Sequence, residues 1–337
     1  MEQKMIPSST GLCNINLRFW EPADKAPCAV LTIMHGMAEH VDRYDAFAGF
    51  LNQNGIAVAA ADMASHGKSI SENGIRGYFG EENGWEHLVE DACNVHQVIK
   101  EAYPSIPCFL LGHSMGSFLA RSYAARHGED IAAFIFCGTA GKNPIMPIAK
   151  LFAKNEIKRI GPSTPSRKLD SMAFGAYSKP FERRTAFDWL SADKENVDRY
   201  VADPLCGFTF TAAAFLDLFT GLDEVSKSEW ASKVPDKPIF VIAGDKDPVG
   251  NMGKGPREVA AKLTATGHDV TFKLYPGMRH EILNETDKEA VWQDVLDFLT
   301  CILTEVLLWR ITIGQRCMKS CPAARIARLQ RAGTMWL

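Results

Sequence analysis

A serine lies at the centre of a pattern that could carry nucleophilic chemistry. Ser114 is the middle residue of Gly112-His-Ser-Met-Gly116, where glycines two before and two after the serine allow a strand and a helix to approach closely. Such a turn pushes the serine hydroxyl outward. It also places the backbone N–H of Met115 at a helix N-terminus, where a developing oxyanion is favoured. The pattern therefore predicts a serine nucleophile, with Met115 as one oxyanion donor.

The chain also contains a candidate base and a candidate acid for this serine. A serine hydroxyl is a weak nucleophile until a base takes its proton, and the base needs a carboxylate to orient it. His280 and Asp247 each follow an apolar run that predicts a buried strand, and Asp245 is an alternative acid. In an open parallel sheet these loops meet at the carboxyl edge, where Ser114 also lies. The chain order serine, acid, histidine is typical of one class of serine enzymes.

A second oxyanion donor is expected from the loop after an earlier strand. The segment His35-Gly-Met37 occupies that place, and we assign the N–H of Met37 as the donor. Several neighbouring residues are expected to shape the loops around the site without taking part in the chemistry. These residues are His35, Gly36, His113, His40, His66 and Glu39.

Apolar runs alternate with helical patterns through most of the chain. The expected strands are 13–20, 29–34, 56–61, 108–111, 131–137, 238–243 and 269–275; the expected helices are 43–54, 85–102, 118–125, 257–266 and 288–301. This alternation predicts an α/β fold with a mainly parallel central sheet and helices on both faces. Such a sheet would bring the candidate residues together at one edge.

The alternation stops between residues 141 and 222, where proline and aromatic residues are frequent and no strand pattern is present. An apolar insertion between two strands predicts a cap over the strand ends, lining an apolar cavity. We therefore expect a core of residues 10–140 and 223–302 and a helical cap of 141–222. Residues 303–337, with six basic residues and one acidic residue, are expected to form a weakly ordered basic extension.

Composition argues against several classes of protein. The net charge of −3 gives no basic field, so nucleic acid is not an expected partner. Nine cysteines with no C-x-x-C pair favour reduced thiols over a disulfide framework or a zinc site. The N-terminus lacks the apolar region of a signal peptide, and no apolar run reaches membrane-spanning length. We expect a cytoplasmic protein; the oligomeric state is not predicted.

Five motifs in register resemble one family. They are His35-Gly-Met-Ala-Glu-His40, Asp62-x-x-x-His66-Gly-x-Ser69, Gly112-His-Ser-Met-Gly116, Gly244-x-x-Asp247 and Gly277-x-x-His280-Glu281. Over residues 10–300 the chain is similar to the monoacylglycerol lipases, lysophospholipases and serine aminopeptidases S33 of the α/β-hydrolase superfamily.

The resemblance implies an α/β-hydrolase fold with a helical cap inserted after the sixth strand and admitting an acyl chain. It implies a serine esterase with a Ser–His–Asp triad, neither metal nor organic cofactor, and an acyl-enzyme on Ser114. The substrate would be a small acyl ester such as a monoacylglycerol or lysophospholipid. The family places the acid three residues after Gly244, which favours Asp247. The chain departs from related lipases at Met37-Ala38, where smaller residues are frequent, and this could narrow the acyl entrance.

Other functions stay open at this point. An aminopeptidase or amidase of the same fold would need carboxylates in the cap for a free α-amine. The cap contains Glu156, Asp170, Glu182, Asp188, Asp193 and Glu195, although acids on a solvated face are the ordinary interpretation. A non-catalytic binding protein would have no need of all three triad residues. Transient contact with a membrane surface, through the cap or the basic extension, is a further possibility.

Overall fold

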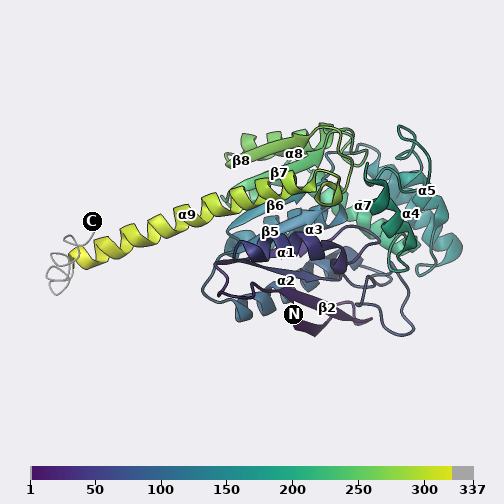
Figure 1. The fold of residues 1–337 in the computed structure, drawn as a ribbon. Helices are drawn as coiled ribbons and strands as arrows, with labels where there is room; N and C mark the ends of the chain where they lie inside the picture. The colour runs from purple at the N-terminus through teal and green to yellow at the C-terminus, as the bar shows by residue number, and fades with distance from the viewer. Residues whose placement is uncertain (1, 321–337) are drawn as a thin grey trace. The chain divides into compact units, whose positions relative to one another are not determined.

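The computed structural model describes residues 2–320. Within them, eight strands form one sheet in the order β1-β2-β4-β3-β5-β6-β7-β8 (Figure 1). The strands are β1 (Glu2–Pro7), β2 (Asn14–Trp20), β3 (Ala29–Met34), β4 (Ile56–Ala61), β5 (Cys108–His113), β6 (Ala133–Cys137), β7 (Ile239–Gly244) and β8 (Val270–Tyr275). Strands β3 to β8 pair in parallel, whereas β1–β2 and β2–β4 are antiparallel. The predicted mainly parallel sheet is confirmed.

The strand β1 was not predicted from the sequence. It forms one edge of the sheet and pairs only with β2, with Ile6 opposite Ile15. The described side chains of β1 are exposed or half-buried, so its sequence shows no apolar run. An edge strand with Pro7 at its end therefore carries little of the hydrophobic pattern by which strands are recognised.

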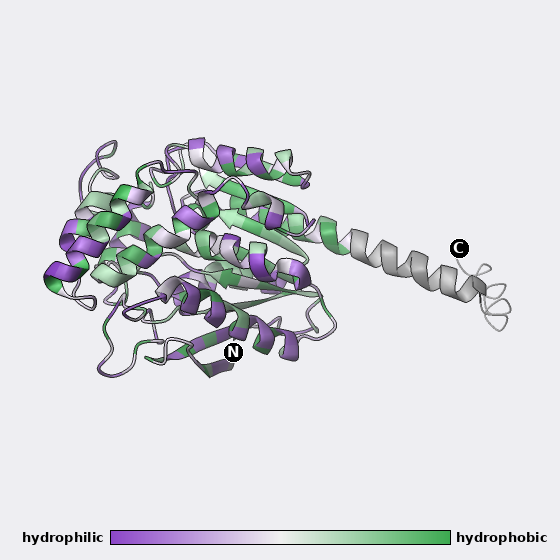
Figure 2. Ribbon diagram, turned by 180° about the vertical axis from the view of Figure 1, so that it is seen from behind, coloured by the Kyte–Doolittle hydropathy of each residue, from purple (hydrophilic) through white to green (hydrophobic). Residues whose placement is uncertain are grey.

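Helices cover both faces of the sheet. They include α1 (Asp45–Gln53), α2 (Gly84–Ala102), α3 (Met115–His127) and α8 (Lys254–Ala265), with short 3-10 helices η1 (Val41–Tyr44), η2 (Gly128–Asp130), η3 (Ala231–Lys233) and η4 (Ile282–Asn284). The last helix of the described chain is α9 (Lys288–Ser320). Figure 2 shows the strands mainly green, and therefore hydrophobic, between helices that are partly purple. This is the distribution expected where strands are buried on both faces and helices are amphipathic.

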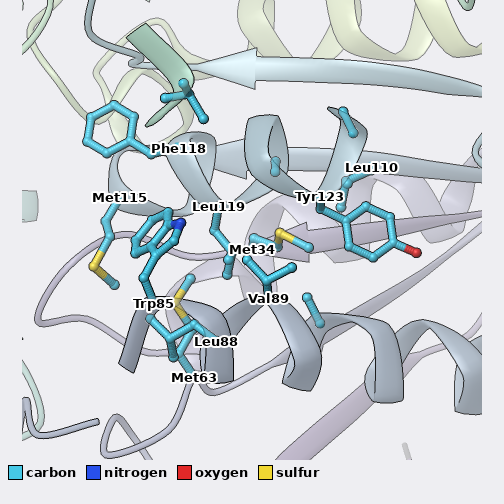
Figure 3. Packing of buried hydrophobic residues seen from close by; sticks show 14 of the residues in the cluster. Met34, Met63, Trp85, Leu88, Val89, Leu110, Met115, Phe118, Leu119 and Tyr123 are labelled. Carbon is cyan, nitrogen blue, oxygen red and sulfur yellow. The ribbon is translucent and has the colours of Figure 1, made fainter. Parts of the chain in front are cut away.

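A cluster of buried side chains joins α2 and α3 to the sheet. Figure 3 shows Trp85 and Leu88 of α2 near Leu119 and Tyr123 of α3. Met115, the first residue of α3, belongs to the same cluster and is 1% exposed. Burial of a large apolar side chain contributes about 1.5–3 kcal/mol to stability. The start of α3 is therefore held firmly against the core.

The cap lies between β6 and β7 and contains α4 (Met146–Ile160), α5 (Arg167–Phe174), α6 (Lys194–Ala202) and α7 (Ala212–Ser226). Figure 1 shows α4, α5 and α7 together beyond one end of the strands. Because this insertion follows β6, it confirms the predicted helical cap after the sixth strand.

The last helix is longer than the sequence predicted. The expected helix ends at Cys301, whereas α9 continues to Ser320. No proline interrupts the sequence between Lys288 and Pro322, so nothing local stops the helix earlier. The chain divides after Asp294 into two compact units, and the sheet and cap belong to the first. Residues 321–337 of the predicted basic extension lie outside the described residues.

None of the helices in residues 2–320 combines the length and the apolarity needed to cross a lipid bilayer.

Candidate active site

The turn between β5 and α3 holds Ser114 in a strained backbone conformation. Its φ is 54° and its ψ is −122°, a positive-φ conformation that residues with a Cβ rarely adopt. The Ser114 N–H donates to the Cys137 carbonyl at 3.0 Å. Its own carbonyl accepts from the N–H of Ser117 at 2.8 Å and from the Ser117 hydroxyl at 2.6 Å. Ser114 is half-buried, whereas the residues on either side of it are buried.

The two glycines of the motif are required by close backbone contacts. A Cβ on Gly112 would lie 2.3 Å from the Gly116 carbonyl oxygen. A Cβ on Gly116 would lie 2.1 Å from the carbonyl oxygen of Met34 in β3. Both distances are far below van der Waals contact, so neither position accepts a side chain without displacing backbone. The helix α3 can therefore begin directly above β5 only because both residues are glycine.

His280 and Asp247 lie side by side in the loops after β8 and β7. The His280 Nδ1 and Asp247 Oδ2 atoms are 3.0 Å apart, and both side chains are buried. Within the described chain, neither of these two atoms makes a hydrogen bond, so the contact between them is an ion-pair contact. The second carboxylate oxygen, Oδ1, accepts from the Val249 N–H at 2.8 Å. The carboxylate is thus oriented toward the imidazole, which leaves His280 Nε2 available to act on a proton.

The alternative acid, Asp245, has a structural role. Its Oδ1 accepts a hydrogen bond from the Gly277 N–H at 2.8 Å, in the turn after β8. This bond ties the Asp245 carboxylate to the turn after β8, and Asp247 is the acid that lies beside His280.

The His280 ring lies close to the serine turn. A Cβ on Gly138 would be 3.2 Å from His280 Cε1, and Gly138 directly follows Cys137, whose carbonyl binds the Ser114 N–H. The ring of Trp189, from the cap, lies 5.2 Å from the His280 ring between centroids. The core therefore supplies the triad residues, and the cap covers the histidine.

The loop after β3 passes directly beside the nucleophile. A Cβ on Gly36 would lie 3.1 Å from Ser114 Cβ. The Gly36 N–H donates to Glu39 Oε1 at 2.5 Å. In the described part of the chain, no acceptor lies within hydrogen-bonding distance of the Met37 and Met115 N–H groups. This availability is what an oxyanion site requires of its donors.

Two buried neutral histidines fix this loop from below. Burial lowers the pKa of His35, and it lowers the pKa of His66 to about 3. His35 Nδ1 donates to the Gly36 carbonyl at 2.7 Å, and its Nε2 accepts from the Met63 N–H at 2.9 Å. His66 Nδ1 donates to the Ala64 carbonyl at 3.0 Å, so its Nε2 accepts from the Ala38 N–H at 3.2 Å. Both histidines thus shape the loop, as expected from their position.

His113 and Glu39 form a buried pair behind the triad. Burial acts to lower the pKa of His113, but the hydrogen bond to Glu39 raises it above the ordinary value. Burial acts to raise the pKa of Glu39, but His113 and Arg43 hold it well below its ordinary value. His113 Nδ1 lies 3.2 Å from Glu39 Oε1, and its Nε2 lies 3.3 Å from the His280 carbonyl. His113 therefore links the loop after β3 to the backbone of His280.

Sequence reasoning missed the cation at the centre of this network. Arg43 binds Glu281 through two bonds of 2.5 and 2.6 Å and binds Glu39 at 2.8 Å. Asn196, from α6, donates to Glu281 at 2.8 Å. Because Glu281 follows His280 directly, this network connects the catalytic loop, the oxyanion loop and the cap. The only feature of the sequence that could have indicated this network is the spacing of Glu39 and Arg43, which are four residues apart at the start of a predicted helix.

His40 contacts the cap. It does not bind Glu39, whose carboxylate instead binds the Gly36 N–H in the loop after β3. His40 Nε2 lies 2.8 Å from Asp203 Oδ2. One ligand atom each from His40, Asp203 and Cys206 lies within 4.8 Å of the others, a set that could bind a metal. The Arg43 guanidinium acts electrostatically on both Asp203 and Cys206, which disfavours a second cation there. The His40–Asp203 pair is therefore interpreted as a contact between core and cap.

Aromatic residues of the cap gather above the histidine. The rings of Phe174 and Trp189 stack with centroids 6.5 Å apart, and Tyr177 packs edge-on against Trp189 at 5.2 Å. A small cavity of about 40 Å³ lies beside Thr32 and His96, and a groove of about 560 Å³ lies along Arg159 and other cap residues. No triad residue lines either hollow. The acyl cavity expected beneath the cap stays a prediction.

Comparison with known proteins places the chain among lipases and esterases. Residues 25–287 match the family described as serine aminopeptidase, S33. A monoacylglycerol lipase of Mycolicibacterium smegmatis is 29% identical over 83% of this chain and 90% of its own length. A monoglyceride lipase of Rattus norvegicus is 26% identical over 89% of each. A carboxyl esterase structure from Bacillus coagulans, in complex with glycerol, has a TM-score of 0.85 and 33% identity, covering 90% of this chain and 98% of that chain.

Proposed function

Because the chain belongs to the serine aminopeptidase S33 family of α/β-hydrolases, we propose that it is a serine ester hydrolase that cleaves monoacylglycerols or chemically similar acyl esters. The observation that carries the proposal is the pairing of His280 with Asp247 at 3.0 Å beside the strained turn of Ser114. This set matches the requirements of nucleophilic acyl transfer: a half-buried serine on a strained turn, an oriented base and an acid that fixes its tautomer.

The catalytic cycle follows from these positions. As the Ser114 Oγ attacks the ester carbonyl carbon, the hydroxyl proton of Ser114 passes to His280 Nε2. The tetrahedral oxyanion is stabilised by the N–H groups of Met37 and Met115, and loss of one such donor typically costs about 3 kcal/mol. His280 then protonates the leaving alcohol, which departs and leaves an acyl-enzyme. Water, activated by His280, hydrolyses this intermediate and releases the acid, while Asp247 stabilises the imidazolium in both halves.

Several observations favour acyl glycerols as the substrate. Relatives that share most of the chain's length are described as monoacylglycerol or monoglyceride lipases. The esterase from Bacillus coagulans was solved with glycerol, the alcohol that such a reaction releases. The aromatic residues of the cap above His280 suit an acyl chain. Lysophospholipids are the second substrate class to be tested.

The aminopeptidase alternative receives no support from the acids of the cap. Five of the six candidate acids are occupied by cations or by backbone N–H groups: Glu156 by Arg159, Glu182 by Lys194, Asp188 by the Thr185 N–H, Asp193 by the Glu195 and Asn196 N–H groups, and Glu195 by Arg199. Burial raises the pKa of the sixth, Asp170, which disfavours its charged form. Most of these acids therefore already have partners within the cap, and Glu182 and Glu195 are largely exposed, which agrees with the ordinary interpretation of acids on a solvated face.

The outer face of the cap supports contact with lipid aggregates. Ile145, Ile148, Leu151 and Phe152 follow one another at helical spacing along α4 and its start, and each is about half exposed. Lys168 lies over the Phe152 ring at 6.0 Å. An apolar helix face with adjacent lysines is typical of segments that lie at a lipid surface. We expect the cap to contact micelles or membranes during turnover; the cytoplasmic location stays a prediction.

The proposal is tested with substrate profiles and three variants of the purified protein. Hydrolysis is measured on p-nitrophenyl esters from acetate to palmitate, a monoacylglycerol, a lysophospholipid and an aminoacyl p-nitroanilide. Ser114→Ala and Asp247→Asn are expected to lower kcat by about 10⁴-fold or more. Asp245→Asn, which changes an acid two residues from Asp247, serves as the matched control and should keep most activity. Ester hydrolysis by Ser114→Ala at the wild-type rate would refute the assignment, and cleavage of the anilide alone would favour the aminopeptidase.

A further inference from the structure

The residue after the proposed oxyanion donor has an unfavourable backbone conformation. Ala38 has a φ of +52°, in the left-handed region that residues with a Cβ avoid. It directly follows Met37, whose N–H is assigned to the oxyanion. A conformation of this kind persists only where surrounding contacts impose it. The contacts that hold Ala38 therefore decide the geometry of this half of the oxyanion site.

Both polar backbone groups of Ala38 are bound by residues distant in the sequence. On the core side, its N–H donates to His66 Nε2 at 3.2 Å. On the cap side, its carbonyl accepts from the Tyr200 hydroxyl at 3.0 Å and from the Gly207 N–H at 2.9 Å. The carbonyl thus receives two hydrogen bonds, and both come from the cap.

Met37 is bracketed by these bonds and by those on Gly36. The Gly36 carbonyl belongs to the same peptide unit as the Met37 N–H, and His35 Nδ1 binds that carbonyl at 2.7 Å. Two peptide units further along the chain, the Ala38 carbonyl accepts a hydrogen bond from the Tyr200 hydroxyl. Only the four soft backbone dihedrals of Met37 and Ala38 lie between these two units, and the peptide unit between them is itself held through the Ala38 N–H by His66, which restricts the direction of the Met37 N–H. Loosening either flank would let this donor turn away from the oxyanion.

We propose that the cap completes the oxyanion site through Tyr200, whose hydroxyl holds Ala38 and so orients the N–H of Met37. Tyr200 is then a positioning residue for acyl transfer. The inference rests on the proposed function, because it requires the Met37 N–H to stabilise the tetrahedral intermediate.

Tyr200 is itself rigidly placed for this role. Its side chain is 5% exposed, the Arg43 guanidinium lies 4.9 Å from its ring centroid, and the Phe187 ring lies 5.0 Å away. Burial raises the pKa of the Tyr200 phenol well above its ordinary value, so the group stays a hydrogen-bond donor. Since Arg43 also binds Glu281 beside His280, the network that holds the histidine also holds the tyrosine.

The test is Tyr200→Phe, which removes one hydroxyl and keeps the ring. We expect kcat for a p-nitrophenyl ester to fall about tenfold, equivalent to about 1.4 kcal/mol in the barrier. KM should stay within about twofold, because the bond acts on the transition state. The affinity for an alkyl boronic acid, which forms a tetrahedral adduct with the serine, should fall by the same factor as kcat. Tyr103→Phe, which removes a hydroxyl bound to Glu21, is the control and should change none of these values.

A second substitution separates loop geometry from other effects of the hydroxyl. Glycine adopts the left-handed conformation without the penalty of a Cβ. Adding Ala38→Gly to Tyr200→Phe should therefore restore kcat at least threefold. Circular dichroism and thermal melting confirm that each variant is folded before its kinetics are interpreted.

The outcomes distinguish this inference from the proposed function. Unchanged kcat and boronate affinity in Tyr200→Phe, a rise in KM alone, or failure of Ala38→Gly to restore kcat would each overturn the role of Tyr200. In those cases a serine-dependent esterase still stands, provided that Ser114→Ala is inactive. If Ser114→Ala hydrolyses esters like the wild type, the proposed function itself fails, whatever the Tyr200 variants show.

Discussion

The two proposed oxyanion donors are held in opposite ways. Met115 lies in a turn whose shape is imposed by close backbone contacts: Ser114 is bound by Ser117, three residues away, and Gly116 packs against the backbone of β3. Met37 lies in a loop whose shape depends on hydrogen bonds from His66 and Tyr200, which are 28 and 162 residues from Ala38. The same chemical role can thus rest on steric necessity in the backbone or on side-chain hydrogen bonds.

This difference predicts how each donor responds to substitution. The turn of Ser114 contains backbone atoms in direct contact, so even one added methyl group forces the strand and helix apart. The loop of Met37 is held by several side chains, each of which can be weakened separately. One substitution at the turn should therefore abolish stabilisation by the Met115 N–H. Substitutions around the loop should weaken stabilisation by the Met37 N–H one bond at a time.

The largest effect is expected at the turn. In Gly116→Ala the new Cβ would lie 2.1 Å from the Met34 carbonyl oxygen and 2.3 Å from that of His35. Neither backbone group can yield without distorting β3, so kcat/KM should fall about 10³-fold or more, with a lower melting temperature. Gly49→Ala in α1, where the added Cβ meets nothing within 4 Å, is the control. It should keep activity and gain up to about 1 kcal/mol in stability. An active Gly116→Ala enzyme would show that the turn is less constrained than its geometry indicates.

An intermediate effect is expected from Arg43, the cation that joins the loop after β3 to the loop that contains His280. Arg43→Met leaves the carboxylates of Glu39 and Glu281 buried without their cation. Breaking a buried ion pair on one side typically costs about 3–5 kcal/mol in the free energy of unfolding. Because both carboxylates lie beside catalytic groups, kcat should fall as well.

The matched control is Arg126→Met, since Arg126 also bridges two glutamates, Glu86 and Glu224, but near the surface. Surface pairs of this kind contribute about 0–1 kcal/mol. Urea unfolding and ester kinetics on both variants decide the comparison. Equal losses in the two proteins would contradict the importance assigned to the buried network.

The smallest effect concerns the pH dependence of stability. The pKa of His66 is about 3 in the folded chain, because burial disfavours the charged form, and about 6.5 in an unfolded chain. Between these values the unfolded chain binds one more proton at this site, so this histidine makes the free energy of unfolding rise with pH. The stability is lost as the pH falls from about 6.5 toward 3.

His66→Gln should therefore reduce the slope of the free energy of unfolding against pH by up to one proton, or about 1.4 kcal/mol per pH unit. The measurement is urea unfolding between about pH 4 and pH 6, with the wild type as reference. A glutamine oxygen can still accept the Ala38 N–H, so activity at neutral pH should largely persist. Identical slopes for the two proteins would show that His66 does not titrate as its burial implies.

Much of the fold and the triad could be predicted from the sequence because their determinants are local. Alternating apolar and helical segments predicted the parallel sheet and the cap after β6. The glycines around Ser114 predicted the turn, and the loop positions of His280 and Asp247 predicted their meeting at the carboxyl edge. Strand β1 and the length of α9 were missed, since an edge strand shows little apolar pattern and a helix without a proline has no evident end.

What the sequence determined by itself was the kind of chemistry: a serine, a histidine and an acid, placed after strands whose carboxyl ends must meet. What only the tertiary structure decided was how the site is supported. Arg43, Tyr200 and Asn196 have no motif of their own, and their roles arise from partners 85 to 238 residues away. Hydrogen bonds across such separations depend on how the cap packs on the core, and that packing leaves no periodic or local trace in the chain.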